Sequence, residues 1–488
     1  MKRLAWFAFV LCLTVAGDAA DGERKRGERR VEGRGDGPPA IFHSEIPAYE
    51  GNVMLARPTD HSITANIMLN QAARARIVYG AEGKSEQQTD MLDLKPGEPQ
   101  EIVLDNLPAD AACRYRLVDT DTGKALSPDR CSGTFHTRRA AGSTFTFTIQ
   151  ADSHLDGNSS PELYALTLSN VVACKPDFHI DLGDTFMTGK IATREGAIRQ
   201  YLAQRYYLGL IGHTAPVFLT IGNHDGEEAF RSGADEADGL AVWSCQQRKR
   251  YFSNPVPDRF YTGNTGTNLH AGQLQDYYAW EWGDALFVVL DPYWYSRGNK
   301  GGSAPWNMTL GKTQYDWLAR TLRASKARYK FIFVHQLVGG LDKNGRGGIE
   351  AAPLFEWGGH EKDGKDTFAA NRPGWEKPIH TLLVQSGVSA VFHGHDHFFA
   401  HQELDGIVYQ LVPQPGHPGE GGIRDAANYG YLAGDMGPGS GHLRVTVSNA
   451  RVTVECVRTQ QSTDRDLGQA SPVAYRYSIT GKRQDQTP

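Results

Sequence analysis

Five short polar segments carry the side chains best suited to chemistry. They are Asp152-Ser153-His154, Gly183-Asp184, Gly222-Asn223-His224-Asp225, His335 and Gly394-His395-Asp396-His397. Together they offer carboxylate, amide and imidazole groups but no thiolate, a set that suits divalent Zn, Mn, Fe and similar ions. Alone, each segment has an ordinary alternative: Asp152 could cap a helix, and His335 could be a hydrogen-bonded core histidine.

The candidate ligands outnumber the groups that one ion needs, so the segments predict two ions a few ångströms apart. Paired ions drive in-line displacement at phosphorus, because they position a bridging hydroxide and neutralise charge on the phosphoryl oxygens. Such a site forms only if segments that are far apart in the sequence converge in the fold.

Each polar segment directly follows a short apolar run, which predicts a buried strand that ends at the polar residues. The runs are residues 145–150, 177–182, 216–221, 330–334 and 388–392. In layered α/β folds, ligands gather beyond the carboxyl ends of the strands. The strand ends would therefore bring the five segments together.

Helices are predicted between these strands. Ser159 with Glu162 makes a capping box, and Pro161 fits the first turn of the helix that follows. The other predicted helices cover residues 193–210, 313–324 and 379–385. Strands that alternate with helices indicate an α/β domain.

The order and content of the five segments resemble the metallophosphoesterase (calcineurin-like) superfamily, over roughly residues 144–457. The resemblance implies a four-layer α/β/β/α sandwich that holds two divalent (or Fe/Zn/Mn-type) ions. Carried over residue by residue, one ion would be bound by Asp152, His154, Asp184 and His397. The other would be bound by Asp184, Asn223, His335 and His395.

The resemblance also implies a reaction. A metal-bridging hydroxide would attack the phosphorus of a small phosphomonoester or phosphodiester, while Asn223 helps to hold the developing charge. His224 would act as general acid or transition-state stabiliser, and Asp225 would orient it. The alternative from another class is a catalytically silent metal-binding or adhesion protein with the same fold.

Residues 43–140 contain many short, alternating β-like runs, which predict a small all-β sandwich in front of residues 141–460. This part resembles the fibronectin type III-like module of purple acid phosphatases. The chain departs from those enzymes in two places: Thr185-Phe186-Met187 follows Gly183-Asp184, where they have a metal-ligand tyrosine, and their first segment lacks the histidine that is His154 here. A tyrosinate-iron centre is therefore not expected.

The N-terminus predicts a targeting segment. Lys2 and Arg3 precede the apolar run 4–15 and then small residues, which is typical of a cleavable signal peptide over residues 1–19. The run is too short to span a bilayer, so we expect no membrane span after cleavage and a secreted or periplasmic protein. Residues 20–42 are predicted to be a disordered linker, 230–275 an irregular surface insertion, and 461–488 a tail.

Charge and cysteines bound the remaining possibilities. The formal net charge is −5 and no basic stripe is present, which gives no case for nucleic-acid binding. Export would permit disulfides, and Cys113 and Cys131 flank a strong turn signal at residues 119–123, so a bridged hairpin is predicted. The sequence leaves the metal identity, the substrate and the oligomeric state open.

Overall fold

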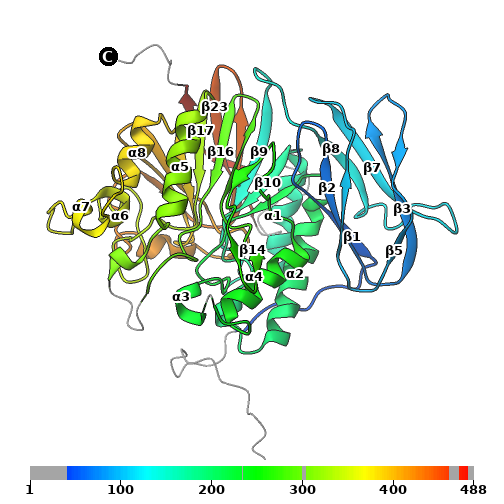
Figure 1. Cartoon of the computed structure of the whole chain (residues 1–488), viewed down its shortest axis with the longest axis horizontal. Helices are drawn as coiled ribbons and strands as arrows, with labels where there is room; N and C mark the ends of the chain where they lie inside the picture. The colour runs from blue at the N-terminus through cyan, green and yellow to red at the C-terminus, as the bar shows by residue number, and fades with distance from the viewer. Residues whose placement is uncertain (1–40, 234, 299–303, 461–471, 482–488) are drawn as a thin grey trace, which may run out of the picture. The chain divides into compact units, whose positions relative to one another are not determined.

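Two mixed β-sheets form the centre of the larger part of the chain (Figure 1). The computed structural model describes residues 41–233, 235–298, 304–460 and 472–481. One sheet has the order β11 (Val217–Leu219), β10 (Phe178–Asp181), β9 (Phe145–Gln150), β22 (Gly441–Val447), β23 (Arg451–Arg458) and β24 (Val473–Thr480). The other has the order β12 (Thr262–Gly263), β15 (Tyr278–Trp282), β16 (Ala285–Val289), β17 (Tyr329–Phe333), β18 (Ala390–His393), β20 (Ile407–Leu411), β19 (Phe399–Leu404) and β21 (Asp435–Gly437).

An aromatic core fills the space between the two sheets. Phe147 of β9 meets Phe287 of β16 edge-on, with ring centroids 5.1 Å apart. Phe218 of β11 stacks on Trp280 of β15 at 4.1 Å. Strands buried on both faces read as continuous apolar runs, which is why the sequence marks them clearly.

Helices cover the outer faces of both sheets. Helices α1 (Pro161–Ala173) and α2 (Arg194–Gly212) share a core with β11, whereas α5 (Lys312–Ala324) and α8 (Ile379–Gln385) share one with β16, β17 and β18. The order of layers is therefore helix, sheet, sheet, helix, which confirms the predicted four-layer fold. In the first sheet β10 pairs in parallel with both β9 and β11, and in the second β17 pairs in parallel with both β16 and β18. This pairing aligns the carboxyl ends that carry the polar segments.

The region in front is all-β, as predicted. One sheet pairs β1 (Gly51–Ala56), β2 (Ile63–Leu69) and β6 (Gln100–Leu104); the other contains β3 (Ala73–Ala81), β4 (Gln87–Gln88), β5 (Leu92–Leu94), β7 (Ala112–Asp119) and β8 (Ser132–His136). Side chains of both sheets form one core. The buried Arg205 of α2 donates to Asn66 Oδ1 and to Asn66 O, both at 2.9 Å, and so joins this region to the α/β part.

The stretch predicted to be irregular, 230–275, contains a regular helix. This helix, α4 (Leu240–Tyr251), packs against α2 and buries Ala241, Cys245 and Arg248 at helical spacing. The amphipathic pattern of this helix is not evident in the sequence, because Arg248 is buried although arginine is usually a surface residue. The remaining short elements are α3 (Ala229–Ser232), α6 (Phe355–Gly358), α7 (Phe368–Asn371), β13 (Thr267–Asn268), β14 (Gly272–Gln273), and the 3₁₀ turns Thr188–Lys190, Pro305–Asn307 and Gly421–Asp425.

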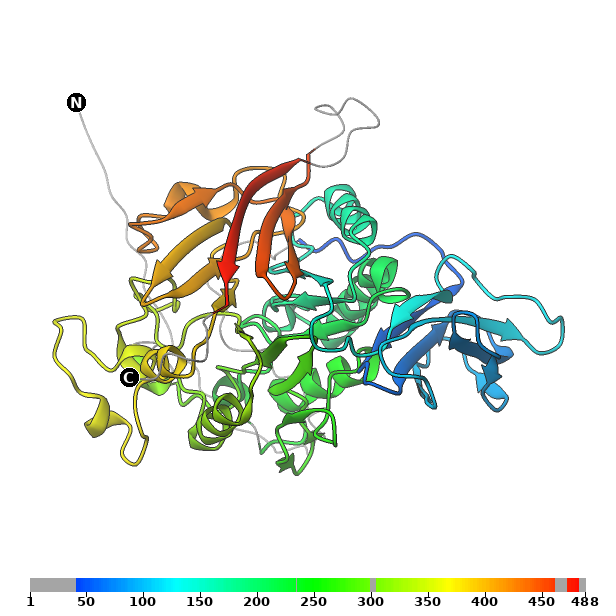
Figure 2. The same cartoon turned by 90° about the horizontal axis from the view of Figure 1, so that it is seen from above.

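Three predicted boundaries need correction. The cap of α1 is Ser160, which accepts from Leu163 N, and not Ser159. The predicted tail contains β24, drawn in red beside β23 in Figure 2, whose Tyr475, Tyr477 and Ile479 pack on the central core. At the end of the predicted linker, Phe42 forms a β-bridge with Asp156.

The predicted signal peptide and most of the predicted linker lie outside the described residues. Within the described part of the chain, no helix combines the length and the apolar character that a membrane crossing requires.

The predicted Cys113–Cys131 disulfide is wrong. The turn between them forms, with Asp119 Oδ1 accepting from Thr122 N at 2.7 Å. However, Cys113 pairs with Phe135 across the hairpin, four residues beyond Cys131. At about 3.3 Å per residue, the offset is about 13 Å, whereas a disulfide needs Cα atoms within about 7 Å. Both cysteines are buried free thiols.

Two buried histidines should make the fold sensitive to acid. Burial lowers the pKa of His179 and of His442 to about 3, below the unfolded value of about 6.5. Between these pH values the unfolded chain therefore binds more protons than the folded protein. The free energy of unfolding thus falls as the pH drops from about 6.5 to 3, by up to about 1.4 kcal/mol per pH unit for each histidine.

Urea unfolding of His179→Gln between pH 7 and 5 should show a shallower dependence of the unfolding free energy on pH than the parent. Ile180→Val should lower stability but keep the parent slope; an unchanged slope in His179→Gln would contradict the assignment.

Candidate metal centre

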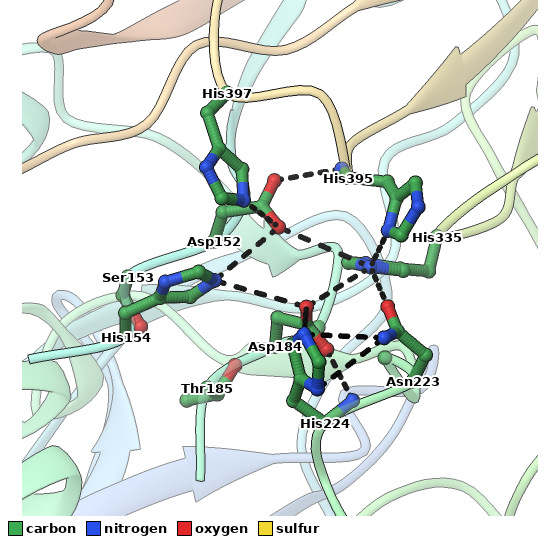
Figure 3. A network of polar contacts seen from close by, with 12 residues as sticks. Asp152, Ser153, His154, Asp184, Thr185, Asn223, His224, His335, His395 and His397 are labelled. Carbon is green, nitrogen blue, oxygen red and sulfur yellow. Dashed lines mark hydrogen bonds and ion pairs between the residues drawn. The ribbon is translucent and has the colours of Figure 1, made fainter. Parts of the chain in front are cut away.

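Loops that follow five strands bring the predicted site residues to one place (Figure 3). Asp152 follows β9, Asp184 follows β10 and Asn223 follows β11 in the first sheet. His335 follows β17, and the pair His395 and His397 follows β18 in the second sheet. The site therefore spans the carboxyl ends of both sheets.

The candidate ligands form two groups, in each of which the potential ligand atoms lie within 4.8 Å of one another: Asp152, His154 and His397, and Asp184, His335 and His395. In the first group, Asp152 Oδ1 lies 3.5 Å from His397 Nε2 and 3.7 Å from His154 Nε2. In the second group, His335 Nε2 lies 3.4 Å from Asp184 Oδ2 and 3.3 Å from His395 Nδ1.

Asp184 lies between the two groups. Its Oδ2 atom is 3.7 Å from His154 Nε2 in the first group and 3.4 Å from His335 Nε2 in the second. Asn223 joins the second group, since its Oδ1 atom is 3.2 Å from His335 Nε2. This is the arrangement that a bridging carboxylate and a neutral amide ligand require.

Unpartnered buried atoms show that cations fit here. Asp152 Oδ1, His154 Nε2 and Asp184 Oδ2 are buried, and none has a hydrogen-bond partner in the described part of the chain. Buried polar atoms are normally paired, because an unsatisfied one costs about 1–3 kcal/mol. Two divalent cations bound by these oxygen and nitrogen atoms would satisfy all three.

The backbone at the site is held in unusual conformations. Asp152, His154, Asp184, His395 and His397 all have positive φ, from 44° to 79°. Non-glycine residues adopt such angles at an energetic cost, and they cluster at functional sites. Close packing also requires Gly222, because a Cβ there would lie 2.1 Å from Asp184 N.

Neighbouring groups orient the imidazoles. His335 Nδ1 lies 2.8 Å from the carbonyl oxygen of Leu182, and His395 Nε2 lies 2.8 Å from that of Asn344. His154 Nδ1 is 3.3 Å from Asp156 Oδ2. Because these nitrogens donate outward, the opposite ring nitrogen keeps its lone pair for a cation.

Sequence reasoning missed two of these supporting residues. Asp156 had a signal, since it stands two residues after His154 and a carboxylate beside a ligand histidine is a common arrangement. Asn344 had no signal in the sequence, because it contacts His395 through its backbone carbonyl oxygen, which every residue has.

Asp225 has a different role from the predicted one. Its carboxylate accepts four backbone N–H groups, from Asp184, Thr185, Phe186 and Gly222, at 2.7–3.0 Å. Its oxygens are therefore committed to the loop after β10 and not to the His224 ring. Asp225 positions Asp184, whose Oδ1 atom in turn accepts from His224 N at 2.7 Å.

The two ligand carboxylates are anionic. Burial raises the pKa of Asp184, but the neighbouring His335 imidazole, together with the side-chain contact of His154, outweighs burial and holds the pKa well below its usual range. Burial would also raise the pKa of Asp152, but the neighbouring His397 and His154 outweigh burial and lower it. Burial lowers the pKa of His224 to about 3, so this ring is neutral.

One side of the cluster is open to solvent. The side chains of Asp152, Asp184, His154 and His335 are at most 4 % exposed. In contrast, His397 is 33 % exposed and His224 is 27 % exposed. A substrate would therefore approach the cations past these two rings.

Thr185, which directly follows Asp184, takes no part in the cluster. Its hydroxyl donates to Asp181 Oδ1 at 2.6 Å. Among the nearby aromatic side chains, Trp280 and Trp282 belong to the central core, whereas the ring of Tyr293 lies 6.2 Å, centroid to centroid, from that of His335.

Fold and site define a class of protein. Residues 145–399, more than half of the 488-residue chain, match the calcineurin-like phosphoesterase family, and the chain belongs to it. The protein is a metallophosphoesterase with two candidate metal sites.

Particular structures share the fold. PhoD is similar with a TM-score of 0.61 at 14% identity, over 89% of this chain and 92% of that one. The purple acid phosphatase PPD1 from yellow lupin (Lupinus luteus) seeds is similar with a TM-score of 0.57 at 14% identity, over 88% of this chain and 74% of that one. No curated protein sequence matches the chain.

Proposed function

We propose that this protein is an exported hydrolase that cleaves a small phosphomonoester or phosphodiester at the two-metal centre. The observation that carries the proposal is the set of unpartnered buried atoms, Asp152 Oδ1, His154 Nε2 and Asp184 Oδ2, beneath an open side. The export part rests on the residues at the N-terminus, Lys2, Arg3 and the apolar run that follows.

Asp152, His154 and His397 would hold one cation together with Asp184, and the other would be held by Asp184, Asn223, His335 and His395. When bound, such cations polarise phosphoryl oxygens and make water a stronger nucleophile. The protein orients the substrate against them. His224 is fixed by its backbone bond to Asp184, and its exposed ring can donate an N–H to a phosphoryl or leaving-group oxygen.

Replacing His224 should separate catalysis from metal binding. In His224→Ala, turnover of an alkyl phosphate should fall by about 10²- to 10³-fold, the range for losing one hydrogen-bond donor to a developing negative charge. An aryl phosphate should lose less, since its leaving group needs less help. Elemental analysis should still find two ions per chain, because the His224 ring is not one of their ligands.

His61→Ala, an exposed change in the all-β region, serves as the matched control and should keep parent turnover. Equal turnover of the alkyl phosphate by His224→Ala and the parent would remove this residue from the mechanism.

A panel of phosphomonoesters and phosphodiesters tests the function itself, with the protein reconstituted in Mn, Zn and Fe. We expect turnover of at least one ester class that stops after chelation. Metal-loaded protein that hydrolyses neither class would favour the non-catalytic metal-binding alternative.

A further inference from the structure

A pocket of about 520 Å³ lies at the β12–β15 side of the second sheet, away from the metal centre. Its lining residues come from β15 and β16, from α5 and the residue after it, from the segment 259–262 and from Arg138. β16 begins at Ala285 and runs parallel to β17, whose carboxyl end leads to His335. The pocket residues Glu281 and Leu286 therefore lie at the opposite end of the strands from the metal ligands.

The edge of the sheet is partly uncovered at this pocket. β12 pairs with β15 only at Tyr278 and Ala279. β15 continues through Glu281 to Trp282 without a further partner in the described β12. The pocket thus occupies a place where the sheet lacks a neighbouring strand.

The inner surface of the pocket is apolar and aromatic. Ala279 and Leu286 are buried, and Trp317 and Phe260 also line the pocket. Trp317 is fixed by a hydrogen bond from its Nε1 to Thr262 Oγ1 at 3.3 Å. Rings of this kind favour a flat apolar ligand.

The rim is positively charged. Arg138, Arg259 and Arg320 line the pocket together with one acidic residue, Glu281. Glu281 lies 3.6 Å from Arg138 and also accepts from Ser325 Oγ at 2.6 Å. Arg259 and Arg320 form no ion pair among the described residues, so two guanidinium groups are available to an anion.

Two buried donors at the pocket are also unsatisfied. Arg138 Nε and Trp280 Nε1 have no hydrogen-bond partner in the described part of the chain, and both residues line the pocket. Because unpaired buried donors are unfavourable, an acceptor from a ligand would improve the site. The shape of the pocket, its positive charge and its unpaired donors therefore all favour the same kind of ligand, one that is flat, apolar and anionic.

We propose that this pocket is a second binding site, for a flat aromatic molecule that carries an anionic group. The ring would lie against Trp317 and Phe260. The carboxylate, sulfonate or phosphate would face Arg259 and Arg320. This inference is independent of the phosphoesterase chemistry, because no metal ligand contributes to the pocket.

Anilinonaphthalene sulfonate is a suitable probe, because it combines aromatic rings with one anionic group and its fluorescence rises on binding. Titrated into the metal-loaded full chain, it should bind more tightly than phenylnaphthylamine, which lacks the sulfonate. Arg320→Gln and Arg259→Gln should each weaken binding of the sulfonate by about tenfold, because each removes a charge-assisted contact. Ala324→Trp should block the pocket.

Arg323→Gln is the matched control, since Arg323 lies on the same helix but pairs with Glu376 outside the pocket. It should bind the probe as the parent does, and all these variants should keep parent phosphoesterase turnover. Parent-like sulfonate binding by Arg320→Gln, Arg259→Gln and Ala324→Trp, or equally tight binding of the neutral probe, would overturn the proposal.

Discussion

Asp184→Asn should empty the metal centre and abolish turnover. Asp184 Oδ2 lies within 3.7 Å of a candidate ligand nitrogen in both groups, His154 Nε2 and His335 Nε2. Loss of a contact outside the ligand shell already costs about 10- to 100-fold in affinity or activity. Loss of the charge shared by both cations should cost more than that.

The substitution should leave the fold intact. The amide oxygen of the new asparagine can still accept from His224 N, the bond that Asp184 Oδ1 makes at 2.7 Å. Only the negative charge between the imidazoles disappears. Without it, two divalent cations would repel each other with no carboxylate charge shared between them.

Elemental analysis and turnover of an aryl phosphate measure the effect together. The matched control is Asp181→Asn, three residues earlier. Asp181 is also buried, and burial raises its pKa to about 6. Its oxygens accept from Gly183 N and from the Thr185 hydroxyl, so it is not a ligand. The control should retain two ions and measurable turnover. Two ions per chain in Asp184→Asn would show that Asp184 does not bridge.

The sequence predicted the ligand cluster because each ligand immediately follows a buried parallel strand. His335 is one residue beyond the apolar run that becomes β17, and His395 follows the run that becomes β18. A strand buried on both faces leaves a continuous apolar signature, and parallel pairing then fixes where its end must lie.

Features that depend on tertiary contacts could not be predicted from the sequence. Asp225 stands beside His224 in the sequence, yet its carboxylate turns to the backbone of another loop. Asn344 supports His395 through a carbonyl group that every residue has. The two pocket arginines, Arg259 and Arg320, are 61 positions apart and share no motif. In each case the deciding partner is distant in the chain and leaves no local pattern.

The loop that carries Asn223 and His224 continues to Glu227, which forms a buried ion pair with Arg248 of α4. Arg248 Nε donates to Glu227 Oε1 at 2.6 Å, and Nη2 donates to Glu227 Oε2 at 2.9 Å. Nη1 and Nη2 also donate to the carbonyl oxygens of Gln275 and Leu274. Both side chains are 1 % exposed.

Arg248→Met should lower the free energy of unfolding by about 3–5 kcal/mol, the usual cost of removing one partner from a buried pair. The change keeps a similar volume but removes both side-chain donors of the buried Glu227 carboxylate and one donor each from the carbonyl oxygens of Leu274 and Gln275. Arg199→Met is the matched control. It breaks the exposed pair with Glu195 on α2 and should cost about 0.3–0.5 kcal/mol. Urea unfolding followed by circular dichroism measures both variants.

The double variant Glu227→Met/Arg248→Met distinguishes the ion pair from general packing. With both charges gone, no charge is buried alone, so the double variant should be more stable than Arg248→Met. Because Glu227 lies four residues beyond Asn223, Arg248→Met should also reduce turnover well below its unfolding temperature, by loosening the loop that presents Asn223 and His224. A loss in Arg248→Met no larger than that in Arg199→Met would mean that α4 does not anchor this loop.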